Sequence, residues 1–65
     1  MQGTIGERIR QKRKELKLTQ KELARRMKEV SHVAISQWES NTTKPNAENL
    51  YELSILFGCD LSWLL

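Results

Sequence analysis

Apolar residues recur at helical spacing in successive segments of the chain, and no segment alternates regularly between apolar and polar positions. The pattern predicts helices over residues 5–16, 20–27, 32–40 and 47–57, with a last short turn at Leu61–Leu64. There is no hairpin signal between these segments. The sequence therefore predicts an all-α fold with five helices, in one domain over residues 1–65.

Polar residues stand immediately before each predicted helix and mark where it begins. Thr4–Glu7 and Thr19–Glu22 both match the capping box, in which a Thr hydroxyl and a Glu carboxylate exchange hydrogen bonds with backbone N–H groups. Caps for the later helices are expected from Ser31, Asn46 and Asp60. Gly58 follows the fourth helix, where a left-handed residue commonly ends a helix.

The apolar side chains expected to face the core are Ile5, Ile9, Leu16, Leu23, Ala24, Met27, Ala34, Ile35, Trp38, Leu50, Leu53, Leu56 and Phe57. Val33 does not fit this arrangement, because it projects from the far side of helix 32–40 among uncharged polar residues. A helix that faces water usually carries Lys and Glu there. This face is therefore a candidate contact surface.

Charge is distributed unevenly along the chain. The net charge is +3, but residues 1–30 hold ten Lys and Arg against four Glu, whereas residues 31–65 hold one Lys against four acidic residues. The asymmetry favours a polyanionic partner for one side of the fold. Basic helices also occur simply as solvated surfaces, so charge alone leaves both interpretations open.

Two short helices joined by a tight turn, at residues 20–27 and 32–40, are typical of a helix-turn-helix, whose second helix enters the DNA major groove. The groove displays hydrogen-bonding groups and thymine methyls. His32, Ser36 and Gln37 supply the hydrogen-bonding side chains, and Val33 supplies an apolar contact. For His32, a solvated position in the first helical turn is the alternative interpretation.

Several other function classes find no support in the sequence. One histidine and one cysteine, Cys59, cannot form a disulfide or a metal site, and no catalytic triad, paired carboxylates or phosphate loop is present. Cys59 is expected to pack as a small apolar residue. No run is long and apolar enough for a membrane span or a signal peptide. We therefore expect an intracellular, non-enzymatic protein without cofactor or metal.

The segments GERIRQKRKELKLTQKELA, VAISQWE, TKPNAENL and GCDLSWLL together cover nearly the whole chain. In their order and spacing the chain resembles the helix-turn-helix domains of lambdoid phage repressors and Cro proteins, especially repressors with a V-S-x-V-A-I-S-Q-W-E recognition helix. The resemblance implies a phage-encoded or bacterial repressor head that binds a palindromic operator in double-stranded DNA. It also implies that the chain is the DNA-binding part of a longer repressor; a natural protein of this length is the alternative.

The resemblance assigns roles to individual residues. Base edges are expected to be read by His32, Val33, Ser36 and Gln37. Phosphates are expected to be bound by Gln20, Arg13, Lys21, Asn41, Thr43 and Lys44. Arg13 is expected to form a partly exposed ion pair with Glu39, which would contribute only about 0–1 kcal/mol to stability.

The chain departs from the family in two places. His32 stands where family members usually have Gln or Asn. The turn between the two helices reads MKEVS, one residue longer than the family form V-G-V-S and without its glycine. We expect the added residue to let Lys28 and Glu29 complete the turn without a glycine; the alternative is that the longer turn shifts the recognition helix slightly.

The last turn is unusually apolar for its length. Leu61, Trp63, Leu64 and Leu65 are expected to make a two-fold contact in a weak homodimer that forms mainly on DNA. A second hypothesis uses the same residues differently: a small helical adaptor or antitoxin-like regulator that binds another protein through this end. The neutral polar face of helix 32–40, flanked by basic residues, favours the repressor.

Overall fold

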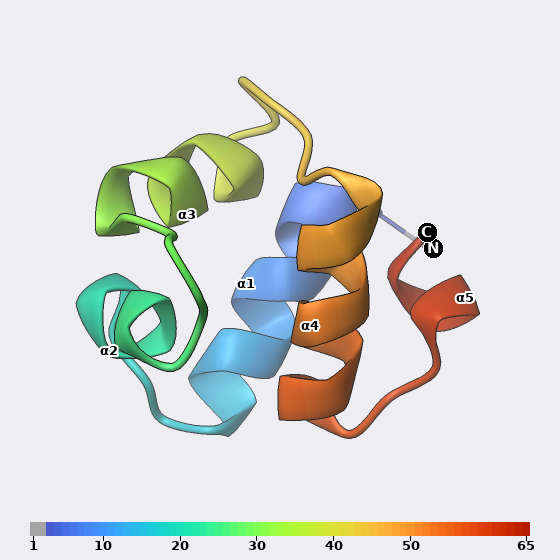
Figure 1. The fold of residues 1–65 in the computed structure, drawn as a ribbon. Helices are drawn as coiled ribbons and strands as arrows, with labels where there is room; N and C mark the ends of the chain where they lie inside the picture. The colour runs from blue at the N-terminus through green and yellow to red at the C-terminus, as the bar shows by residue number, and fades with distance from the viewer. Residues whose placement is uncertain (1–2) are drawn as a thin grey trace.

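The computed structural model describes residues 3–65, and within that range it contains five helices and no strand. The helices are α1 (Ile5–Glu15), α2 (Gln20–Arg25), α3 (His32–Glu39), α4 (Ala47–Phe57) and α5 (Leu61–Leu64). Figure 1 shows α2 and α3 on one side of α1, with α4 and α5 on the other. The predicted all-α architecture is confirmed. No helix among these residues is long and apolar enough to cross a membrane.

The first three helices end earlier than predicted, by one residue in α1 and α3 and by two in α2. In α2 the cause is a tightening of the last turn. The N–H of Arg26 donates to the carbonyl of Leu23 at 3.0 Å, and the N–H of Met27 donates to the carbonyl of Ala24 at 3.1 Å. Both bonds span three residues rather than four, which closes a helix end. Met27 still faces the core and is only 6% exposed.

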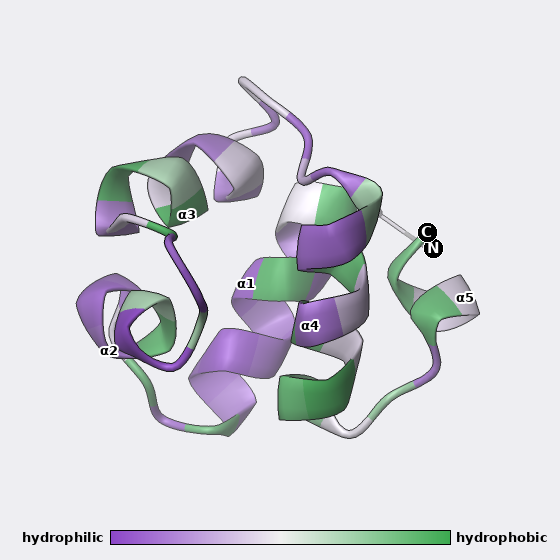
Figure 2. Ribbon diagram, in the orientation of Figure 1, coloured by the Kyte–Doolittle hydropathy of each residue, from purple (hydrophilic) through white to green (hydrophobic). Residues whose placement is uncertain are grey.

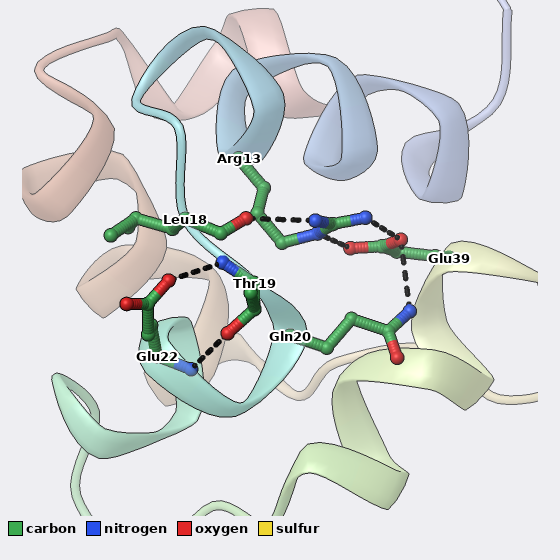
Figure 3. Close-up of polar contacts among 6 residues, drawn as sticks. All are labelled: Arg13, Leu18, Thr19, Gln20, Glu22 and Glu39. Atoms are coloured by element: carbon green, nitrogen blue, oxygen red, sulfur yellow. Dashed lines mark hydrogen bonds and ion pairs between the residues drawn. The ribbon is translucent and has the colours of Figure 1, made fainter.

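Local hydrogen bonds fix the helix starts. Both capping boxes are present; in the second, Glu22 N–H donates to Thr19 Oγ1 at 3.0 Å, and Thr19 N–H donates to Glu22 Oε1 at 2.7 Å (Figure 3). The bond from the Thr19 backbone lowers the pKa of the Glu22 carboxyl. Asp60 was expected to cap α5, but its side chain makes no capping bond. Its carbonyl oxygen instead accepts from the N–H of Trp63 at 3.0 Å.

The core lies where α1 packs against α3, α4 and α5, and where α2 packs against α3. Its buried apolar side chains are Ile9, Leu23, Ala24, Met27, Ile35, Trp38, Leu53, Phe57 and Leu64. Figure 2 shows α1 as mostly hydrophilic, whereas α4 and α5 carry large hydrophobic stretches. Leu16 was expected to face inward, but it follows the end of α1 and is 46% exposed.

The turn between α2 and α3 contains a residue in the left-handed conformation that glycine adopts most readily. Glu29 has φ 53°, in the left-handed region that disfavours residues with a Cβ atom. The turn is therefore completed without a glycine, as expected, although Glu29 takes the positive φ that a glycine would adopt more easily. The N–H of Lys28 donates to Glu52 Oε2 at 2.8 Å, which ties the turn to α4. A hydrogen bond to another helix thus holds the turn.

Gly6 allows the start of α1 to touch the end of α3. A Cβ atom on Gly6 would lie 2.3 Å from the carbonyl oxygen of Trp38 and 2.7 Å from that of Glu39. The N–H of Gly6 also donates to Asn41 Oδ1 at 3.1 Å. The two helices therefore meet through backbone atoms, which leave no room for a side chain.

We predict that Gly6→Ala destabilises the domain by at least about 2 kcal/mol, because the colliding atoms are backbone and cannot rotate away. Urea unfolding followed by circular dichroism measures the loss. Lys14→Ala, at an exposed position of the same helix, is the matched control and should leave stability nearly unchanged. Equal stability of the two variants would contradict the close contact.

Candidate nucleic-acid interface

The outward face of α3 carries the side chains that the sequence assigned to base reading. His32, Val33, Ser36 and Gln37 are all exposed, and Val33 is 52% exposed. The opposite side of α3 is anchored in the core by Ile35 and Trp38, which are 0% and 4% exposed. Packing of Ile35 and Trp38 in the core therefore fixes which face of α3 is exposed.

Basic side chains lie beside the first turn of α3. A surface hollow of about 280 Å³ is lined by Lys21, Ala24, Arg25, Val30 and His32. Lys21 was expected to bind phosphate, whereas Arg25 was not singled out. Arg25 follows Lys21 by four residues, so both cations lie on one face of α2. This spacing could have identified Arg25 from the sequence.

A second hollow, of about 260 Å³, lies beside the other end of the α3 face. It is lined by Arg10, Arg13, Gln20, Ser36, Glu39 and Ser40. Arg10 was not predicted, although it precedes Arg13 by three residues and so shares its side of α1. The exposed polar face of α3 is therefore bordered by cationic groups from both α1 and α2, the arrangement suited to a phosphate backbone on each side of a groove.

Arg13 and Glu39 form the ion pair expected from the resemblance (Figure 3). Arg13 Nε donates to Glu39 Oε2 at 2.6 Å, and Arg13 Nη2 donates to Glu39 Oε1 at 3.0 Å. Arg13 Nη1 also donates to the carbonyl oxygen of Leu18 at 2.8 Å, and Gln20 Nε2 donates to Glu39 Oε1 at 3.2 Å. The hydrogen bond to Glu39 raises the pKa of Arg13.

The pair is more buried than predicted. The side chains of Arg13 and Glu39 are only 11% and 6% exposed, so the pair is less exposed than expected, and its expected contribution of about 0–1 kcal/mol stays a prediction. Removal of one member of a buried pair leaves the other charge without compensation. Arg13 and Gln20 were both expected to contact phosphates. Their side-chain N–H groups instead donate to Glu39, and these bonds connect α1, α2 and α3.

Asn41 was expected to contact DNA phosphates, but its side chain forms hydrogen bonds within the domain. Its Oδ1 accepts from Gly6, and its Nδ2 donates to Thr4 Oγ1 at 2.8 Å. Asn41 itself has φ 62°, which Asn tolerates better than most residues. Its side chain therefore connects the end of α3 to the start of α1. Thr43 and Lys44 follow in the same loop with exposed side chains.

The apolar end of the chain is only partly available for contacts. Leu64 was expected in a dimer interface, but it is 0% exposed and belongs to the core, so it is removed from that surface. Trp63 is half-buried beneath cations: Lys12 Nζ lies 4.9 Å from its ring centroid, and Arg8 Nη1 donates to its carbonyl oxygen at 3.1 Å. Leu61 and Leu65 are 38% and 61% exposed.

Groups of His, Cys, Asp and Glu that could hold a metal ion do not occur within residues 3–65. Cys59 is half-buried and packs against the core, as expected for a small apolar residue. Burial raises the pKa of its thiol, which disfavours the reactive thiolate.

We predict that Glu39→Gln destabilises the domain by about 3 kcal/mol, because Arg13 then loses its charged partner in a poorly hydrated site. Urea unfolding of Glu39→Gln, Arg13→Met and the double variant should show strong coupling between the two positions. The control is Glu15→Gln, which removes an exposed ion pair with Lys12 and should scarcely change stability. Additive losses at the two positions would show that the pair is not a unit.

Comparison with known proteins agrees with this geometry. A family model described as helix-turn-helix matches residues 9–64. The HTH-type transcriptional regulator DicA of Escherichia coli (strain K12) is 50% identical over 62 residues, which are 95% of this chain and 45% of DicA. Repressor protein C2 of Salmonella phage P22 is 52% identical over 61 residues, or 94% of this chain and 28% of C2. The chain therefore spans less than half the length of these curated relatives.

Two solved structures of the P22 c2 repressor share the fold. The crystal structure of its complex with synthetic operator 9T, in the presence of Tl⁺, has a TM-score of 0.90 and 49% identity, over 97% of this chain and 94% of that one. The solution structure of its DNA-binding domain has a TM-score of 0.87 and 47% identity, over 98% and 83%. This chain belongs to the helix-turn-helix family and is homologous to lambdoid phage repressors.

Proposed function

We propose that this domain binds a specific operator in double-stranded DNA and represses transcription, with α3 in the major groove. One observation carries the proposal: the exposed face of α3 is neutral and hydrogen-bonding around a half-exposed valine, and it is bordered by cations from α1 and α2. The relative of known structure, the P22 c2 repressor, was solved with a synthetic operator. We place the activity in the cytoplasm, where the DNA of a bacterial host lies.

Base recognition falls to the four side chains that project from α3. His32, Ser36 and Gln37 donate to and accept from base edges, and Val33 packs against thymine methyl groups. His32 carries two ring nitrogens where the resemblance implies an amide, so its preferred base differs from that of a Gln or Asn reader. The operator of this protein is therefore expected to differ from those of its relatives at that position.

Phosphate contacts fix α3 in the groove from both sides. Lys21 and Arg25 serve one strand from α2, and Arg10 serves the other from α1. Thr43 and Lys44 extend the contact beyond the end of α3. Arg13 and Gln20 add only the donors that Glu39 and the Leu18 carbonyl do not use.

Two copies are expected to bind a palindromic operator, with their α3 helices about 34 Å apart, one turn of DNA. Leu61 and Leu65, together with the accessible part of Trp63, supply the two-fold contact. This surface is small, so the homodimer forms mainly on DNA. An adaptor or antitoxin-like role is the second hypothesis, but it gives no reason for the uncharged face of α3.

We predict that DNA affinity falls steeply with salt, because each phosphate neutralised by Lys or Arg releases condensed counterions. The logarithm of the binding constant should fall by about 0.9 for each such contact per unit of log salt concentration. Fluorescence anisotropy with a duplex selected from random sequences measures the slope. Lys21→Gln should reduce it, whereas Lys14→Gln, away from both hollows, should not. A flat salt response would contradict an operator reader.

We predict that Val33→Ala weakens operator binding by about 1–2 kcal/mol, the scale of burying a few methyl-sized surfaces. Stability should scarcely change, because the side chain is 52% exposed in the free domain. Replacing the facing thymines by uracil removes their methyl groups and should weaken the wild type by a similar amount.

The alanine variant is the control for the uracil experiment. If Val33 touches the methyl groups, uracil should weaken binding by Val33→Ala much less than binding by the wild type, since groups that share a contact are coupled. Fully additive losses would mean that Val33 does not contact those methyls. Val33 would then be an ordinary exposed surface residue.

A further inference from the structure

A hollow of about 600 Å³ lies between the α2–α3 turn and α4, apart from the face assigned to DNA. It is lined by Lys28, Glu29, Asn46, Glu48, Asn49, Tyr51, Glu52 and Ile55. None of these residues lines either of the hollows that border α3. We name this surface the α4 groove. It is formed in part by the α2–α3 turn, through Lys28 and Glu29.

Two large apolar side chains in the α4 groove have no cover within the described domain. Tyr51 and Ile55 are each 61% exposed, although they lie on a helix whose other face, with Leu53 and Phe57, is buried. They are four residues apart and so lie one above the other on the surface of α4. Together these two adjacent side chains offer a small apolar surface on which a protein partner can pack.

The charge of the α4 groove restricts what can bind there. Glu29, Glu48 and Glu52 surround the apolar pair, against the single cation of Lys28. Glu52 also accepts the backbone N–H of Lys28, so its carboxylate is held in place at the groove wall. A phosphate backbone would be repelled by these groups, whereas a segment rich in Lys or Arg would be attracted.

We propose that the α4 groove docks a basic amphipathic helix of a partner protein. Its apolar side chains would pack on Tyr51 and Ile55, and its flanking Lys or Arg side chains would pair with Glu29 and Glu48. A helix in a shallow apolar groove is a recurrent mode of recognition. Because the α4 groove shares no lining residue with the hollows beside α3, a partner in the groove leaves the face proposed for DNA uncovered.

The test uses a synthetic helical peptide of about 16 residues, long enough to hold helical structure, with two leucines four positions apart and lysines on either side. Titration into ¹⁵N-labelled protein should give saturable shifts in the amides of Lys28, Glu29, Tyr51 and Ile55. Binding should weaken at least about fivefold when salt rises from about 0.05 to 0.5 M, since exposed charges are screened. The same peptide with glutamate in place of lysine should not bind.

Matched variants distinguish specific binding in the α4 groove from non-specific binding of the peptide. Ile55→Asp should weaken peptide binding at least about fivefold through the loss of an apolar contact. The control is Leu65→Asp, which changes an equally exposed side chain just after α5, outside the α4 groove. It should leave peptide binding unchanged. Glu29→Asn replaces the carboxylate by an amide, and Asn tolerates positive φ. This variant should therefore weaken peptide binding without loss of stability.

Three results would overturn the proposal. One is equal binding of the acidic peptide, and another is equal effects of Ile55→Asp and Leu65→Asp. The third is a shift of the same amides with protein concentration alone, together with a dimer in sedimentation, which would assign the α4 groove to a second copy of the chain. Operator binding by Ile55→Asp should match the wild type, so failure here is distinguishable from failure of the proposed DNA function.

Discussion

The buried carboxylate of Glu39 is the constraint on which the placement of α3 depends. It is nearly inaccessible to water and receives two N–H groups from Arg13 and one from Gln20. A buried charge without such partners is strongly unfavourable, so the three helices that supply these groups must keep one arrangement. The backbone contact at Gly6 secures the same end of α3. The base reading proposed for α3 needs this precision, because small displacements lose directional hydrogen bonds.

Local features of the fold could be predicted from the sequence, and long-range ones could not. The caps at Thr4, Thr19, Ser31 and Asn46 act over three residues, so a short motif specifies them. The role of Asn41 depends on a contact with Gly6, 35 positions away, which no local pattern encodes. Leu64 illustrates another limit. In a four-residue helix, periodicity cannot say which apolar side chain is buried.

The exposed face of α3 was predictable because its residue types depart from what water favours. The cationic border was predicted only in part, since Arg10 and Arg25 look like ordinary residues of solvated helices until the fold places them beside α3. Glu29 shows the reverse situation. The missing glycine was visible in the sequence, but the turn keeps a positive φ and is held by the bond from Lys28 to Glu52. In this turn a contact with α4, and not a glycine, accompanies the positive φ.

The charge asymmetry along the chain becomes a separation of surfaces in the fold. Cations from α1 and α2 border α3, whereas the carboxylates of Glu29, Glu48 and Glu52 surround the α4 groove. Figure 1 places α4 across α1 from α2 and α3. Such a domain approaches a polyanion with one orientation preferred, because the field attracts one side and repels the other. If α3 binds DNA as proposed, the same repulsion disfavours DNA in the α4 groove, and Tyr51 and Ile55 then stay accessible.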